Sequence, residues 1–283
     1  MGGYPIGGFR LVRSLRRSGI AQIHLYPNTI GFPRVPLDPL DLRDFAVLLD
    51  VDGTILDIAP TPHTVHVPET LLKTLALVGE RTHGAIALVS GRPIANLDLI
   101  FAPLLLPAIG GHGAEIRPDP RQNTYEPRAT ALDRSLKQKL MDIAKKYEGV
   151  ATEDKGYSFA LHYRLALEHG INVVDDVFRV CKTYPPDSFE LLTGKAVIEV
   201  KSVGFNKGIA VRELMTYPPF AGRAPIFIGD DVTDEAAFEV VPEFNGFAIS
   251  VGRKVPGVNA VFHTPAEVRR WLEKISQHET VAS

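Results

Sequence analysis

Residues 45–54 constrain the fold of this chain more than any other segment. Five apolar residues come first, a run typical of a strand that is buried on both faces of a sheet. Asp50-Val51-Asp52-Gly53-Thr54 follows, so the strand ends in two carboxylates and a turn. Open α/β sheets carry their chemistry at such strand ends, and strand alternation places Asp50 and Asp52 on the same side. Two close carboxylates repel each other unless a cation or a proton intervenes. The segment predicts an acidic site, although a strand followed by an Asx turn is the plainer alternative.

The apolar periodicity elsewhere predicts a doubly wound, Rossmann-like parallel α/β core. We expect a helix over residues 68–80 and a second apolar strand over residues 85–89, which ends in Ser90-Gly91-Arg92-Pro93. A helix over residues 208–215, strands over residues 224–228 and 247–251, and a final helix that begins with a capping box at Thr264 continue the pattern. The glycine-rich residues 110–113 suit a loop close to a ligand.

A second kind of pattern interrupts the core between residues 117 and 200. A proline-rich crossing is followed by helical and strand-like segments that do not alternate as βαβ units, which indicates a small α+β module. We therefore expect residues 41–116 and 201–283 to form the core, and residues 117–200 to form an inserted domain. Residues 1–40 are rich in Arg, Gly and Pro, and we expect either a poorly ordered extension or a start codon placed too far upstream.

Composition excludes several classes of protein. A chain of 283 residues with 45% hydrophobic residues can bury one or two ordinary cores. The net charge of −2 argues neither for nor against binding to nucleic acid. Because no dense basic tract follows residue 20, we expect no nucleic-acid partner. The single cysteine, Cys181, lies among apolar residues, which favours a buried, inert thiol and a reducing compartment. No apolar run reaches the roughly 18 residues of a membrane span, so we expect a cytoplasmic protein with no membrane partner.

Three strand ends and one helix start carry side chains that suit phosphoryl transfer. They are Asp50 and Asp52, Ser90, Lys207, and the group Asp230, Asp231 and Asp234. A phosphomonoester brings about two negative charges, so a site built on carboxylates needs cations to accept it. Mg²⁺ prefers oxygen ligands of this kind, a lysine supplies further positive charge, and a serine hydroxyl can hydrogen-bond a phosphate oxygen.

In this order, the four motifs resemble those of the haloacid-dehalogenase-like phosphatases. They are Asp50-Val51-Asp52-Gly53-Thr54, Ser90, Lys207, and Gly229-Asp230-Asp231 followed by Asp234. The resemblance implies that Asp50 is the nucleophile, that Asp52 is the general acid/base, and that Ser90 and Lys207 complete the catalytic set. It also implies Mg²⁺ as the cofactor, bound at Asp50, Asp52 and Asp230 with Asp231 and Asp234 in the outer sphere.

Further segments narrow the resemblance to the trehalose-6-phosphate phosphatases. They are residues 90–93, 111–115, 155–164, 194–201 and 229–235, so the similarity spans about residues 44–253 and includes the inserted module. In that family the module is a cap that specifies the substrate. Ser202 departs from the family, which often has proline there, and residues 1–40 have no counterpart that we can place.

The resemblance implies a set of substrate-binding residues that joins the core to the cap. The set is Asp50, Val51, Asp52, Gly53, Arg92, His112, Glu153, Lys155 and Glu199. Plainer alternatives are that Glu153 pairs with Lys155, and that His162 and Arg164 form a solvated strand face. The expected function is Mg²⁺-dependent hydrolysis of trehalose 6-phosphate through an aspartyl phosphate, the final step of trehalose biosynthesis, with a synthase as a functional partner. The alternatives are a phosphatase for another sugar phosphate, such as sucrose phosphate, and a catalytically silent sugar-phosphate sensor.

Overall fold

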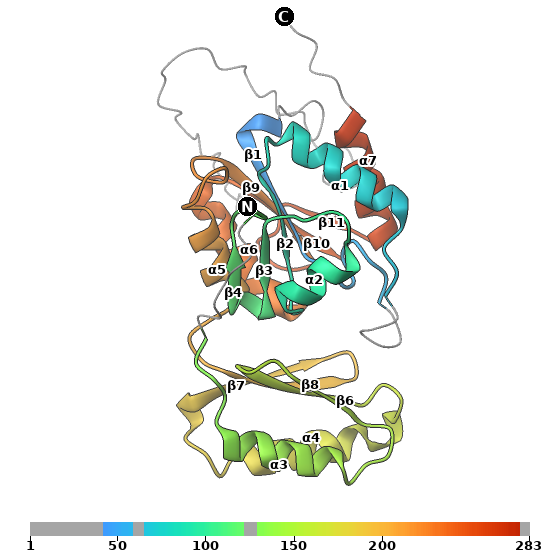
Figure 1. Cartoon of the computed structure of the whole chain (residues 1–283), viewed down its shortest axis with the longest axis vertical. Coiled ribbons are helices and arrows are strands. Elements are labelled where there is room, and N and C mark those ends of the chain that lie inside the picture. Colours follow the sequence, from blue (N-terminus) through green and yellow to red (C-terminus); the bar gives the residue numbers. More distant parts are fainter. Residues whose placement is uncertain (1–41, 59–64, 122–128, 278–283) are drawn as a thin grey trace, which may run out of the picture. The chain divides into compact units, whose positions relative to one another are not determined.

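The computed structural model describes residues 42–58, 65–121 and 129–277, so the segment for which we expected an N-terminal extension lies outside the described residues. Within the described residues the strands form two sheets (Figure 1). The larger sheet has seven strands in the order β11-β10-β9-β1-β2-β3-β4 and is parallel except for the pairing of β3 with β4. Its strands are β1 (Phe45–Leu49), β2 (Ile86–Val89), β3 (Ala108–Gly110), β4 (Glu115–Arg117), β9 (Ala224–Gly229), β10 (Phe247–Val251) and β11 (Ala260–Phe262).

Helices cover both faces of the seven-stranded sheet. They are α1 (Glu69–Arg81), α2 (Ile94–Ile100), α5 (Lys207–Leu214), α6 (Glu235–Val240) and α7 (Pro265–Gln277). The apolar side chains of β1 pack on both faces of the sheet, because successive side chains of a strand point to opposite faces. Val47 and Leu49 pack in one buried cluster with α1 and α7, whereas Ala46 and Leu48 pack in another with α5 and α6. The expected doubly wound α/β core is confirmed.

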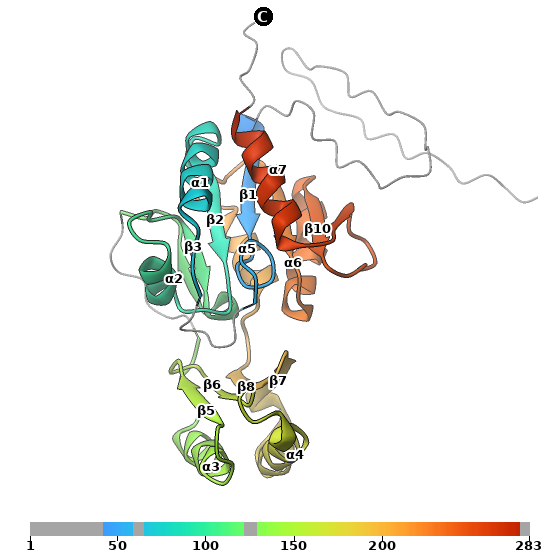
Figure 2. The same cartoon turned by 90° about the vertical axis from the view of Figure 1, so that its right-hand side faces the viewer.

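The second sheet is antiparallel, with the order β5-β6-β8-β7. Its strands are β5 (Ala151–Asp154), β6 (Ser158–His162), β7 (Phe189–Gly194) and β8 (Val197–Ser202), and its helices are α3 (Arg134–Ala144) and α4 (Gly170–Cys181). Asp133 caps α3 by accepting a hydrogen bond from the Leu136 backbone N–H at 2.9 Å. Both helices pack against the sheet over one buried cluster that contains Phe159, Val177 and Cys181 (Figure 2).

The inserted module therefore lies between β4 and α5 in the chain. β4 runs to Arg117 in the seven-stranded sheet, and β8 runs to Ser202 in the four-stranded sheet. That this module is a domain with boundaries at residues 117 and 200 stays a prediction. The sequence pattern missed α2, β4, β5, α6 and β11, because each is too short to show a clear apolar period. Among the described helices, none is long and apolar enough to cross a membrane.

Candidate active site

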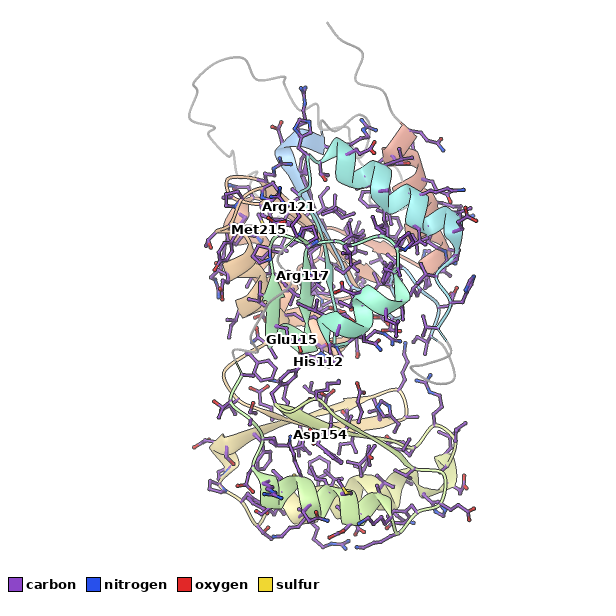
Figure 3. All side chains as sticks on the ribbon, viewed as in Figure 1. His112, Glu115, Arg117, Arg121, Asp154 and Met215 are labelled. Atoms are coloured by element: carbon purple, nitrogen blue, oxygen red, sulfur yellow. The ribbon has the colours of Figure 1, made fainter. Side chains whose placement is uncertain are left out.

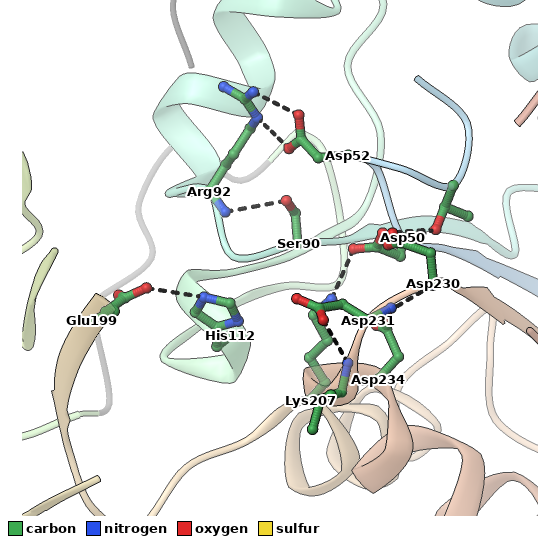
Figure 4. Close-up of polar contacts among 12 residues, drawn as sticks. Asp50, Asp52, Ser90, Arg92, His112, Glu199, Lys207, Asp230, Asp231 and Asp234 are labelled. Atoms are coloured by element: carbon green, nitrogen blue, oxygen red, sulfur yellow. Dashed lines mark hydrogen bonds and ion pairs between the residues drawn. The ribbon is translucent and has the colours of Figure 1, made fainter. Parts of the chain in front are cut away.

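The carboxyl ends of three adjacent strands bring the predicted core residues together. β1 pairs in parallel with β9 on one side and with β2 on the other. Asp50, Ser90 and Asp230 are the residues that directly follow β1, β2 and β9. Parallel strands end at the same edge of a sheet, so the fold itself gathers these side chains at one place (Figure 4).

Asp50 is buried and bound through both carboxylate oxygens. Thr54 Oγ1 donates to Oδ2 at 2.8 Å, and Lys207 Nζ donates to Oδ1 at 2.7 Å. Burial raises the pKa of Asp50, and the ion pair with Lys207 opposes that rise. The two contacts fix the direction of this carboxylate.

Lys207 is the cation at the centre of the site. It is the first residue of α5, and Asn206 caps that helix by accepting from the Ile209 backbone N–H at 2.8 Å. Lys207 Nζ donates to Asp234 Oδ1 at 2.6 Å in addition to Asp50. Burial alone would lower the pKa of Lys207, but the charges of Asp234 and Asp50 outweigh burial and hold it above its usual range. The ammonium therefore remains charged inside the protein.

Three carboxylates converge beside this lysine. One oxygen from each of Asp50, Asp230 and Asp234 lies within 4.8 Å of the others. Burial, reinforced by the charge of Asp50, raises the pKa of Asp230 to about 7. Gly53 has a φ of +89°, and a Cβ on it would lie 2.2 Å from Asp230 Oδ2, so a glycine is required where the loop passes Asp230. Lys195 of the inserted module lies 3.5 Å from Asp230 Oδ2, so this carboxylate also has a cationic neighbour. Converging carboxylate oxygens of this kind fit a divalent cation.

Asp234 supports this cluster from behind. Its Oδ1 accepts from Lys207, and its Oδ2 accepts from the backbone N–H groups of Asp230 and Asp231, each at 3.0 Å. Because both oxygens are already engaged, the contacts favour a role in which Asp234 holds the loop, although its oxygens lie close enough to belong to the cluster. Asp231 also faces its own loop, since its Oδ1 accepts from the Val232 N–H at 2.7 Å.

Asp52 occupies a different position from the one that strand alternation predicted. β1 ends at Leu49, so Asp52 lies in the turn beyond the strand and alternation does not set its direction. Its carboxylate accepts from Arg92 Nε at 2.6 Å and from Arg92 Nη2 at 2.7 Å, a bidentate pair separate from that of Asp50 and Lys207 (Figure 4). The Asp52 carboxylate is not among the three that converge in the described cluster, and its expected role at a metal site stays a prediction.

Ser90, Val51 and Gly53 lie in the same region. Ser90 is buried, and its Oγ accepts from the Arg92 N–H at 3.1 Å. The Val51 carbonyl accepts from the N–H groups of Thr54, Ile55 and Leu56, which closes the turn that carries Gly53.

The predicted sugar-binding residues of the inserted module also lie together. Glu199 on β8 accepts from Lys155 Nζ at 3.1 Å and from Ser158 Oγ at 2.6 Å. Glu153 lies 3.1 Å from His162 Nε2 and 3.9 Å from Lys155 Nζ. Burial alone would raise the pKa of Glu199, but Lys155 and the hydrogen bonds outweigh it and keep the pKa well below its usual range. The contacts hold Glu153, Lys155 and Glu199 together on the inserted module.

His112 links this group to the core. Its Nε2 lies 3.3 Å from Glu199 Oε2 (Figure 4). Burial lowers the pKa of His112, so a neutral ring that donates from Nε2 accounts for the contact. Nδ1 is then the acceptor, and it is buried with no hydrogen-bond partner among the described residues. Buried polar atoms without partners are rare, which makes Nδ1 a candidate acceptor for a ligand hydroxyl.

Sequence reasoning missed two residues that shape the core site. Thr54 ends the Asp-Val-Asp-Gly-Thr motif, and nothing in the sequence assigned it a role, but its hydroxyl donates to Asp50. Arg253 follows β10, and its guanidinium donates to the Asp230 and Asp231 carbonyls at 2.8 and 2.7 Å. The position of Arg253 just past a parallel strand was the available signal, because side chains at that edge of the sheet reach the site.

Comparisons with known proteins agree on one family. The family model for trehalose-phosphatase matches residues 48–264. The chain is 40% identical to a probable trehalose-phosphate phosphatase of Sinorhizobium fredii over 80% of this chain and 84% of that protein. It is 35% identical to the trehalose-6-phosphate phosphatase of Escherichia coli over 82% of this chain and 86% of that protein. In fold it resembles the C-terminal domain of a trehalose-6-phosphate phosphatase of Candida albicans, with a TM-score of 0.72, 24% identity, and coverage of 83% and 92% of the two chains.

Proposed function

The chain belongs to the trehalose-phosphatase family, and from this premise we propose that it hydrolyses trehalose 6-phosphate to trehalose and phosphate. One observation carries the proposal beyond the family. Lys207 bridges Asp50 and Asp234 in a buried core site, and His112, whose backbone N–H donates to the Ser90 carbonyl at 3.0 Å, contacts Glu199 on the inserted module. A phosphatase needs the first set and sugar recognition needs the second, because carboxylates and an ammonium can together accept from and donate to sugar hydroxyls.

In the proposed chemistry, Asp50 attacks the phosphorus atom. A bond forms between its carboxylate oxygen and phosphorus while the bond from phosphorus to the sugar oxygen breaks, which leaves an aspartyl phosphate. Asp52 protonates the departing sugar oxygen. In the second step it takes a proton from water, whose oxygen bonds to phosphorus while the bond from Asp50 to phosphorus breaks, which releases phosphate and restores the Asp50 carboxylate. Lys207 and the Ser90 hydroxyl stabilise the phosphoryl oxygens. The bidentate contact of Arg92 holds the Asp52 carboxylate at one side of the site.

We propose Mg²⁺ as the cofactor, held by Asp50 and Asp230, with Asp52 contributing through its backbone and with Asp231 and Asp234 outside. When bound, it would offset the negative charge that phosphate and carboxylates bring to the same place. The converging oxygens of the acidic cluster support the proposal. So does the raised pKa of Asp230, which reflects burial and the nearby Asp50 charge.

We propose that residues 117–200 act as a cap, in which Glu153, Lys155 and Glu199 bind trehalose, with Arg92 and His112 contributing from the core. The contacts of Glu199 with Lys155 and His112 support this assignment. A synthase that makes the sugar phosphate would precede this reaction, which would then complete trehalose biosynthesis. Another sugar phosphate as substrate remains the main alternative. A silent sensor is disfavoured because Asp50 and Asp52 are both present and bound by cationic side chains.

A substrate panel tests the proposal. Phosphate release should be fastest from trehalose 6-phosphate, should stop in excess chelator, and should return with Mg²⁺. Glu199→Gln removes the charge of a sugar-binding group, and hydrogen bonds to charged groups contribute about 1.5–3 kcal/mol. At about 1.4 kcal/mol per tenfold, kcat/KM for trehalose 6-phosphate should fall roughly ten- to hundredfold, while hydrolysis of p-nitrophenyl phosphate should change little.

The matched control is Glu148→Gln, which alters an exposed glutamate of the same module and should change neither substrate. Faster release from sucrose 6-phosphate than from trehalose 6-phosphate would replace the proposed substrate. Full activity in excess chelator would count against the metal. Equal losses on both substrates in Glu199→Gln would count against the sugar-binding role.

A further inference from the structure

One buried hydrogen bond joins the inserted module to the core through two residues that are not among the predicted site residues. Tyr157, which directly precedes β6, donates its hydroxyl to Glu115 Oε1 on β4 at 3.0 Å. Both residues are buried, with 2% and 5% of their surface exposed. Figure 3 shows Glu115 close to His112, at the opposite end of β4 from Arg117.

The other oxygen of Glu115 holds the core. Its Oε2 accepts from the Ile94 backbone N–H, the first residue of α2, at 2.7 Å. Glu115 therefore connects Tyr157 to the start of the helix that follows Arg92. Burial and the Glu115 charge raise the pKa of Tyr157, so the hydroxyl stays protonated and available as a donor. A buried carboxylate that lost this donor would be left short of one partner, which is costly.

The glycine-rich loop between β3 and β4 makes the room for this contact. Gly111 has a φ of +56°, and a Cβ on it would lie 1.9 Å from the Tyr157 hydroxyl oxygen. A Cβ on Gly110 would lie 2.9 Å from Glu115 Oε2. The Tyr157 ring also packs edge-on against Phe205, with centroids 5.7 Å apart. These two glycines therefore leave space for Glu115 and for a tyrosine of the inserted module, and the expected closeness of this loop to a ligand stays a prediction.

The position of Tyr157 links this contact to sugar binding. On its own segment Lys155 and Ser158 both hydrogen-bond Glu199, and on the core side His112, next to Gly111, contacts the same Glu199. A shift of Tyr157 against the loop would therefore move Lys155 and Glu199 relative to His112. Resting on the proposed function, we propose that the Tyr157–Glu115 hydrogen bond is a positioning contact that sets the sugar-binding residues over the phosphatase site.

The test compares two substrates in two matched variants. Tyr157→Phe removes the hydroxyl but keeps the ring against Phe205. Tyr147→Phe is the control, because the Tyr147 hydroxyl donates to Asp176 at 3.1 Å within the inserted module alone. Tyr157→Phe should lower kcat/KM for trehalose 6-phosphate about five- to hundredfold, which corresponds to about 1–3 kcal/mol. It should change p-nitrophenyl phosphate hydrolysis less than about twofold, and Tyr147→Phe should leave both rates unchanged.

Glu115→Gln supplies an independent variant. When its amide oxygen still accepts from Ile94, its NH2 group faces the Tyr157 hydroxyl and can only donate to it, so the charged acceptor is lost and the contact is weakened. This variant should show a smaller loss that is still selective for trehalose 6-phosphate, and the double variant with Tyr157→Phe should lose less than the product of the two single losses. Equal slowing of both substrates, no slowing of either, or independent losses in the double variant would overturn the proposal. If Tyr157→Phe fails to fold, Glu115→Gln decides by the same criterion. If the unaltered protein hydrolyses p-nitrophenyl phosphate but not trehalose 6-phosphate, the proposed function fails instead.

Discussion

Lys207 should stabilise the folded core as well as serve the phosphatase reaction. Its ammonium lies 2.7 Å from Asp50 and 2.6 Å from Asp234, and the three side chains are 2%, 6% and 0% exposed. Lys207→Met keeps roughly the length of the side chain but removes its positive charge, so two buried carboxylates lose their common partner. Both carboxylates then have to be protonated or left as uncompensated charges.

The size of the effect follows from this burial. Removing one partner of a buried ion pair costs about 3–5 kcal/mol, and each kcal/mol lowers the Tm of a chain of this size by roughly 2–4 °C. Thermal unfolding of Lys207→Met, followed by circular dichroism in excess chelator so that no cation compensates, should show a Tm lowered by roughly 6–20 °C. Phosphate release should be lost, because the charge that stabilises the phosphoryl oxygens is gone.

The deficit should also depend on pH. Burial raises the pKa of both Asp50 and Asp234, and Lys207 is the largest influence that opposes burial. A carboxyl whose pKa is higher in the folded than in the unfolded chain favours folding at low pH and loses that contribution as the pH rises through the folded pKa. Without Lys207 both pKa values rise further, so the Tm deficit should be larger at pH 8 than at pH 5.

Lys73→Met is the matched control for burial. Lys73 also lies 2.7 Å from a carboxylate, that of Glu69, but the two side chains are 70% and 79% exposed. An exposed pair of this kind contributes little to stability, so its loss should leave the Tm nearly unchanged. If the two variants lowered the Tm equally, or if the Lys207→Met deficit grew toward low pH, the account of a buried charge cluster would be wrong.

Two further outcomes follow from the site and the inserted module. Asp50→Asn should abolish phosphate release without loss of fold, and Asp52→Asn should reduce turnover by roughly 10²–10⁴-fold; steady-state kinetics with circular dichroism checks both, and near-normal turnover in Asp50→Asn would contradict covalent catalysis. Burial raises the pKa of Cys181 to about 11, so at pH 8 only roughly one thousandth of the folded thiol is thiolate, compared with roughly a quarter of an ordinary one. Iodoacetamide should therefore label the folded chain at least about 100-fold more slowly than the urea-unfolded chain, and equal rates would place this thiol at the surface.

The sequence could predict which core residues lie together, because the carboxyl ends of adjacent parallel strands meet at one edge of the sheet. Asp50, Ser90 and Asp230 each follow a run of apolar residues, and the adjacency of their strands makes them neighbours. Lys207 was equally accessible, because it begins a helix whose N-cap is readable as Asn206. In these cases local patterning and topology decide the position of the side chain, and both are readable from one sequence.

The direction of Asp52 could not be predicted in this way. Its carboxylate is oriented by Arg92, 40 residues further along the chain, and no local pattern identifies the partner of a residue in a turn. The same limit applies to Gly111. The glycine-rich residues 110–113 predict that another group comes close to this loop, but they do not identify that group. Tyr157, 46 residues later, fills that position. The pairing of Glu115 with Tyr157 is likewise a product of packing between two modules.

This limit matters for specificity more than for chemistry. A carboxylate–lysine site can act on any phosphomonoester that enters it, so discrimination among sugars must come from groups that touch the sugar. Binding energy from a distant glucose speeds the reaction only if those groups are held rigidly to the reacting centre. In this chain the described polar contacts that provide such a connection include His112 with Glu199 and Tyr157 with Glu115. Substitutions at these contacts should therefore change which phosphate esters are hydrolysed well while the core chemistry survives, whereas substitutions at Lys207 or Asp50 should stop all hydrolysis alike.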